Sequence, residues 1–145
     1  MRAFFSWDVL FAAVAVTAMA AILVSAFSIQ SSRVAFQRSL ESRQAEAMLL
    51  ADFILKRCPE DGGLLRCEGR AAFSNELSPG ALEAFNETTL QKAAAILGIR
   101  LNASVKVFAL DGDVLLQAKS VKGLCVRRPA LLEGRTAILE ACIGG

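Results

Sequence analysis

An uncharged stretch of nineteen residues, Val9 to Phe27, constrains this chain more than any other feature, and only Thr17 and Ser25 interrupt its apolar character. At helical rise it would extend roughly 28 Å, close to the thickness of a bilayer's hydrocarbon core. The stretch is long for the apolar part of a cleaved secretory signal, and a chain of 145 residues could hardly surround such a helix in a soluble core. We therefore predict a membrane-spanning helix, with residues 9–29 in the membrane.

The sequence after this stretch has no Pro or Gly before Pro59, and its apolar residues recur at helical spacing. They are Ile29, Phe36, Leu40, Ala47, Leu50 and Ile54, and most charged residues lie off that face. We predict one helix over residues 4–57 that continues from the membrane into water. Its last turns, Met48–Leu55, are apolar around much of the circumference, so the rest of the chain should pack on them.

Residues 58–145 predict a small head of the α+β class, whose sheet is antiparallel with about four strands. A helix should begin after Asn86, a good N-cap residue, and end at Gly98. Alternating residues on either side of Asp111-Gly112 predict a hairpin with a two-residue turn, in which Ala109 lies opposite Val114. Such a sheet has one apolar face, which the two helices could cover.

A second hairpin is predicted around Glu133-Gly134. In this register Cys125 lies opposite Cys142, and Arg127 lies opposite Glu140. The cysteines then occupy a non-hydrogen-bonded pair, where Cα atoms approach closely enough for a disulfide. Pro129 also falls at a non-hydrogen-bonded position, where its missing N–H removes no bond from the ladder.

Four cysteines allow three pairings, and we favour Cys58–Cys67 together with Cys125–Cys142. Free structural thiols are an alternative. A zinc site or a thioredoxin-like redox site would ordinarily show a C-x₂-C motif, which the chain lacks, so we expect no metal. Disulfides would place the head outside the cytoplasm.

Two N-x-S/T triplets, at Asn86 and Asn102, are candidate glycosylation sites and fit an exported glycoprotein, although such triplets often arise by chance. The distribution of cations favours the opposite orientation, because Arg33, Arg38 and Arg43 follow the span and Arg2 alone precedes it. We give the cysteines and the triplets more weight, and expect the head to be extracytoplasmic.

The composition offers little for catalysis or for nucleic-acid binding. The chain has no His, the commonest general base and metal ligand, and its net charge is only +2. Its acids show no pairing that singles out a catalytic site, and Asp111 and Asp113 are explained by a turn. We predict that the protein is not an enzyme, has no cofactor and does not bind nucleic acid.

The N-terminal residues "MRAFFSWDVLFAAVAV" and the layout of the whole chain resemble the type IV pilin family, and more closely the pilin-like proteins of archaea. In that family a prepilin peptidase removes a short basic leader, and the mature chain has an acid at its fifth position. The resemblance implies a leader of residues 1–3, cleavage between Ala3 and Phe4, and an assembly role for Asp8. The sequence departs from the family in having Ala before the cut, Asp instead of Glu at the fifth position of the mature chain, and a very short leader.

Two functions follow as hypotheses. By the resemblance, the chain is a major or minor subunit of a type IV pilus-like surface filament or a pseudopilus, and its partners are the membrane, other pilin-like subunits and the prepilin peptidase. Alternatively, it is a single-pass signal-anchored envelope protein whose head binds a partner, and Asp8 is then an ordinary residue at the membrane interface. Processing at Ala3–Phe4 distinguishes the two.

Overall fold

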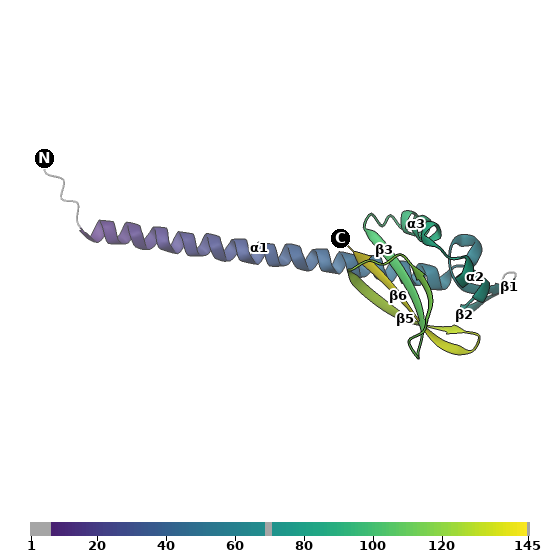
Figure 1. The fold of residues 1–145 in the computed structure, drawn as a ribbon. Coiled ribbons are helices and arrows are strands. Elements are labelled where there is room, and N and C mark those ends of the chain that lie inside the picture. Colours follow the sequence, from purple (N-terminus) through teal and green to yellow (C-terminus); the bar gives the residue numbers. More distant parts are fainter. Residues whose placement is uncertain (1–6, 69–70, 145) are drawn as a thin grey trace. The chain divides into compact units, whose positions relative to one another are not determined.

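The computed structural model describes the backbone of residues 7–68 and 71–144 (Figure 1). The chain divides into two compact units, one ending at Ser39 and the other beginning at Leu40. In chain order the helices and strands are α1 (Trp7–Lys56), a 3-10 turn (Pro59–Asp61), β1 (Leu65–Glu68), β2 (Ala71–Leu77), α2 (Pro79–Ala84), α3 (Glu87–Ile96), β3 (Asn102–Ala109), β4 (Val114–Ala118), β5 (Leu124–Leu132) and β6 (Arg135–Gly144).

The predicted long helix is confirmed over its described residues, because α1 is continuous from Trp7 to Lys56. The boundary between the two units falls inside this helix rather than at its end. We call Trp7–Ser39 the first stretch of α1 and Leu40–Lys56 the second stretch. The second stretch is therefore part of the head.

The head contains a sheet of six strands in the order β1-β2-β5-β6-β3-β4. The α+β class is confirmed, whereas the expectation of about four antiparallel strands is wrong. The two unexpected strands are β1 and β2, which form an irregular antiparallel pair. β2 then joins β5 in parallel through Glu76 with Leu131 and Leu77 with Leu132, so the sheet is mixed. This junction joins segments far apart in the sequence, which local periodicity cannot reveal.

The core of the head lies between one face of the sheet and the helices (Figure 1). Alternate residues of β3 and β6, such as Val105 and Leu139, are fully buried there. The second stretch of α1 contributes a stripe with helical spacing to the same cluster, and α2 and α3 contribute further buried residues, such as Leu82 and Leu90. The stripe consists of Ala47, Leu50, Ala51, Ile54 and Leu55.

The hairpin of β5 and β6 has the predicted register. Cys125 pairs with Cys142, Arg127 pairs with Glu140, and Leu132 and Arg135 flank the turn. Both turn residues, Glu133 and Gly134, have positive φ, as a type I′ turn requires.

The hairpin of β3 and β4 differs from the prediction near its turn. The pairs Val105–Ala118 and Val107–Leu116 are as expected, but Val114 lies opposite Phe108 rather than Ala109. The Ala109 amide donates to the Asp113 carbonyl at 2.9 Å, and Gly112 lies in the left-handed region with φ of 97°. The loop is therefore one residue longer than predicted and ends in a bulge, an arrangement typical of three-residue hairpin loops.

The short helices begin at side-chain caps. The Thr89 amide donates to the Asn86 side-chain oxygen at 3.0 Å, which confirms Asn86 as the N-cap of α3. The Ser78 hydroxyl likewise accepts from the Ala81 amide at the start of α2. α3 ends at Ile96 with Leu97 as its C-cap, and the following Gly98 has φ of 70°, a conformation that glycine adopts without steric cost.

Candidate functional site

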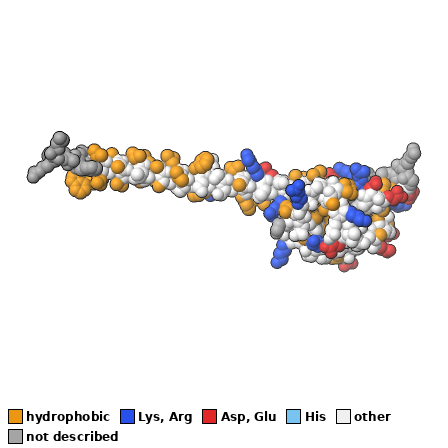
Figure 2. All heavy atoms as spheres, turned by 90° about the horizontal axis from the view of Figure 1, so that it is seen from above, with side chains coloured by type: hydrophobic (Ala, Val, Ile, Leu, Met, Phe, Trp, Pro, Cys, Tyr) orange, Lys and Arg blue, Asp and Glu red, His pale blue; other side chains and the backbone are white. Residues whose placement is uncertain are grey.

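The first stretch of α1 exposes apolar side chains on all sides. Every described side chain from Trp7 to Ser39 is exposed, and large residues such as Ile22, Leu23 and Phe27 are 65–75% exposed. Figure 2 shows these side chains following the helix on the face in view. A helix that is apolar on all sides has no favourable place in water. Within the described residues α1 alone is long and apolar enough to cross a membrane.

The two hydroxyl groups of the uncharged stretch from Val9 to Phe27 are hydrogen-bonded within the helix. Thr17 Oγ1 donates to the carbonyls of Ala13 and Val14, at 3.0 and 2.9 Å. Ser25 Oγ is placed in the same way, 2.9 Å from the carbonyls of Ala21 and Ile22. Hydrocarbon offers no hydrogen bonds, so polar groups on a spanning helix must find internal partners of this kind. The polar residues therefore present no obstacle to membrane insertion.

The predicted processing site lies outside the described residues, which begin at Trp7 and so do not include Ala3 or Phe4. The backbone of Asp8 belongs to α1, but its side chain is also outside the described part of the structure. Cleavage and the assembly role of Asp8 stay predictions.

Both predicted disulfides are present. Cys58–Cys67 joins the segment after α1 to β1, with Cα atoms 5.8 Å apart. Cys125–Cys142 links directly opposite residues of β5 and β6, with Cα atoms 4.0 Å apart. Together they fasten the end of α1 and the centre of the sheet.

The two glycosylation candidates are exposed, but both have structural roles. Asn86 caps α3, as described above. Asn102 begins β3, where its side-chain oxygen accepts from Lys119 Nζ at 3.3 Å. Ser104, the third residue of that triplet, is only 6% exposed. The geometry explains the occurrence of both asparagines without a glycan.

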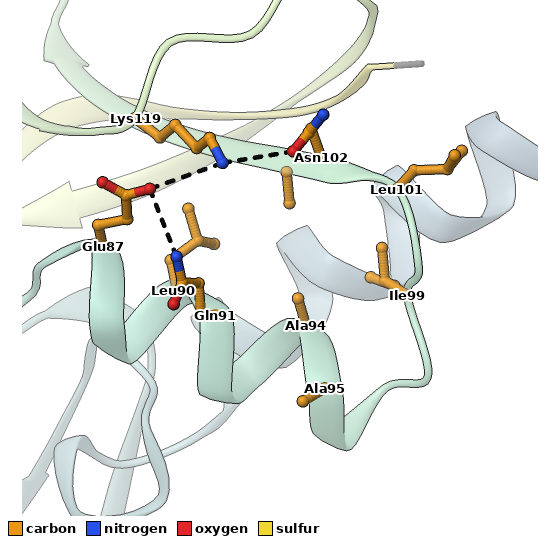
Figure 3. Close-up of a pocket in the computed structure, with 10 residues that line it drawn as sticks. Glu87, Leu90, Gln91, Ala94, Ala95, Ile99, Leu101, Asn102 and Lys119 are labelled. Atoms are coloured by element: carbon orange, nitrogen blue, oxygen red, sulfur yellow. Dashed lines mark hydrogen bonds and ion pairs between the residues drawn. The ribbon is translucent and has the colours of Figure 1, made fainter.

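A recess of about 230 Å³ lies between α3 and β3 (Figure 3). Apolar side chains, including Leu90, Ala94 and Ile99, line its floor. At its rim Lys119 Nζ lies 3.6 Å from a Glu87 carboxylate oxygen and also donates to Asn102. The lining offers no hydroxyl or thiol, and its charged groups are already paired, so the recess carries no evident chemistry.

One group of described residues has the proximity of a metal site, namely Cys125, Glu140 and Cys142. The two cysteines form a disulfide and cannot ligate as thiolates. The Glu140 carboxylate lies 2.6 Å from Arg127 Nε, in the ion pair expected from the register. The group therefore joins strands and does not fit a metal ion.

Arg66 of β1 forms ion pairs with the carboxylates of Glu68 and Glu76. It donates to Glu68 from Nη2 at 2.6 Å and to Glu76 from Nη1 at 2.9 Å. The hydrogen bond to Glu68, followed by that to Glu76, raises the pKa of Arg66 above its usual value. The ion pair of Arg66 with Glu76 links β1 to β2.

A second hollow, of about 390 Å³, lies between the turn of β3 and β4 and the turn of β5 and β6. We call it the turn hollow. Its lining combines small and apolar side chains with three acids and one cation. The residues are Ala109, Asp111, Asp113, Leu115, Leu132, Glu133, Arg135, Thr136 and Ala137.

Sequence reasoning attributed Asp111 and Asp113 to their own turn and did not bring the two turns together. The sheet order was needed for that, because β3 and β6 must be neighbours before their turns meet.

No family model matches the chain, and neither does any curated protein or any solved structure.

Proposed function

We propose that this chain is a structural subunit of a type IV pilus-like filament or pseudopilus, anchored by α1 with its head outside the cytoplasm. The observation that supports this most is the continuity of α1. One helix carries an apolar stretch exposed on all sides and then a stripe buried in the core of the head. Such a subunit can reside in a membrane through its first stretch and present a folded domain through its second.

The exposed first stretch also provides a surface for assembly. Helices of neighbouring copies that lie side by side would bury apolar area that otherwise needs lipid. An axial stagger between copies is a heterologous contact that does not close, and such contacts generate open helical assemblies. The disulfides support the orientation, because they persist in oxidising compartments outside the cytoplasm.

In this proposal Asp8 pairs with a cation during assembly. A carboxylate within the hydrocarbon is costly unless a cation meets it. Cleavage between Ala3 and Phe4 would create such a cation, the new α-amino group of Phe4 on the same or a neighbouring copy. The pair would set the register of neighbouring helices more than it would add stability.

Substitution of Asp8 tests this function. Asp8→Ala should leave a membrane-inserted, disulfide-bonded protein but reduce its filament or secreted fraction at least about tenfold, since removing one partner of a desolvated ion pair costs about 3–5 kcal/mol. Asp8→Glu should assemble, because it keeps the charge. Asp8→Asn should behave like Asp8→Ala if charge matters.

The measurements are the sheared or secreted fraction relative to the membrane fraction, and the mass of the mature N-terminus. A terminus at Phe4 supports the proposal. An uncleaved terminus together with a silent Asp8→Ala substitution would instead favour the signal-anchored envelope protein.

A further inference from the structure

The face of α1 that is buried at Ala47 can be followed along the helix towards the N-terminus. From Ala47 towards the N-terminus, the positions on this face are Arg43, Leu40, Phe36 and Arg33, at steps of four, three, four and three. Exposure rises along them, from 0% at Ala47 to 36% at Leu40 and 64% at Phe36. We call Arg33, Phe36, Leu40 and Arg43 the arginine stripe. Ala47, about three turns along the same face of the helix from Phe36, is fully buried.

The arginine stripe has a simple chemical pattern, with two apolar side chains between two cations. It follows the predicted span of residues 9–29, so it lies where water rather than lipid would meet Phe36. Among the described residues neither Arg33 nor Arg43 takes part in an ion pair. A surface that complements the stripe would therefore be apolar at its centre and acidic on both sides.

The turn hollow has that pattern. Leu115 and Leu132 contribute its apolar walls. Asp111 and Asp113 come from one turn and Glu133 from the other, against the single cation Arg135. No ion pair within the described part of the chain involves these three acids. The lining of the hollow thus combines apolar side chains with an excess of two negative charges.

The distance between the two arginines of the stripe is comparable with the distance between the two turns. Arg33 and Arg43 are ten residues apart, or about 15 Å along a helix. The centres of the two hairpins are two strand spacings apart, or about 10 Å. Flexible arginine side chains can bridge the remaining difference, and the volume of 390 Å³ can hold an aromatic ring such as that of Phe36.

We propose that the turn hollow of one copy binds the arginine stripe of a second copy, with Phe36 as the anchor. This inference rests on the proposed assembly function and names one contact within it. A second copy is the favoured occupant because the same chain carries both complementary surfaces. Since the two surfaces differ, the contact is heterologous and can repeat from copy to copy without closing.

Such a contact is small and should be weak for free molecules. A membrane holds copies close together with restricted orientation, which raises the effective concentration of one surface near the other. The charges should mainly select the partner and its register, whereas burial of Phe36 should supply most of the affinity.

Charge exchange in the full-length protein tests the contact. Asp113→Lys with Glu133→Lys should reduce the filament fraction about fivefold or more, and Arg33→Glu with Arg43→Glu should do the same. Combining all four substitutions should restore assembly to within about twofold of the unmodified protein, because the opposite charges then face each other again. Asp111 is left unchanged, since its carboxylate accepts from the Asp113 amide within the turn.

Matched controls use charges away from both surfaces. Glu60→Lys with Asp61→Lys reverses two exposed acids of the head, and Arg38→Glu reverses a cation of α1 off the stripe. Both controls should assemble normally. The proposed contact would be overturned if the control variants lost as much of the filament fraction as the test variants. It would also be overturned if the fourfold variant assembled no better than either double variant. Protease resistance of the head excludes simple unfolding as the cause.

A photo-crosslinking residue at position 36 separates this inference from the proposed function. The expected product joins position 36 of one copy to a peptide that contains Leu115 or Leu132 of another. If filaments form but the crosslink goes elsewhere, the contact is wrong and the filament function stands. If no filament forms but the predicted crosslink appears in membranes, the contact stands and the filament function fails.

Discussion

The two stretches of α1 belong to one unbroken helix but have opposite surroundings. In the first stretch Ile22 is 65% exposed, whereas Ile54 in the second stretch is fully buried. The two stretches also differ in their charged residues. None occurs from Val9 to Phe27, whereas Asp52 in the second stretch lies 3.0 Å from Lys56 and 3.4 Å from Arg128.

The difference shows how one secondary structure can suit two solvents. A helix that is apolar all round fits a uniform apolar medium, and a helix with one apolar stripe fits a protein core on one side and water on the other. The helical conformation itself does not distinguish the two cases. The arrangement of apolar and charged side chains around the axis does.

The largest predicted effect is that of truncating a buried isoleucine of the second stretch, with an exposed isoleucine of the first stretch as the control. Ile54→Ala should destabilise the head by about 2–5 kcal/mol, because it leaves a cavity in a packed core. Ile22→Ala is the matched control and should leave the stability of the head unchanged. Urea unfolding of the detergent-solubilised protein, followed by protease resistance of the head, measures both. Equal losses for the two variants would mean that the stretches do not differ as described.

A smaller effect is expected from the disulfide just after α1. Replacing Cys58 and Cys67 together by Ser should cost about 2.5 kcal/mol in the chain-entropy model for a closed loop of this size, whose ends are nine residues apart. The loss should appear in the second stretch and the head, with membrane insertion of the first stretch unaffected. The same assay, combined with carbonate extraction of membranes, checks both parts. Release of the variant from the membrane would contradict the division of roles.

Local patterns in the sequence were sufficient for α1, for the cap at Asn86 and for the register that brings Cys125 to Cys142. Each depends on residues close together in the chain or on a turn with strict φ requirements. β1 and β2 were not predicted because their pairing is irregular, and because β2 contains Asn75 with φ of 59°. The parallel junction of β2 with β5 depends on tertiary packing alone.

Among the candidate sites, too, some could be predicted from the local sequence and others could not. The cysteine pairs followed from spacing and strand register. The turn hollow did not, because Asp113 and Glu133 come together only through the order of strands in the sheet. The local sequence indicated two separate turns, and only the tertiary structure shows that they form one surface.

Amide hydrogen exchange of the full-length protein in lipid bilayers tests the contrast between the two stretches most directly. Two protected segments are predicted, residues 9–27 shielded by lipid and residues 47–56 shielded by the head, each protected for hours, with faster exchange over residues 30–39. In assembled filaments residues 33–40 should become protected as well. Rapid exchange of residues 9–27 in the bilayer, with protection confined to residues 47–56, would contradict the account.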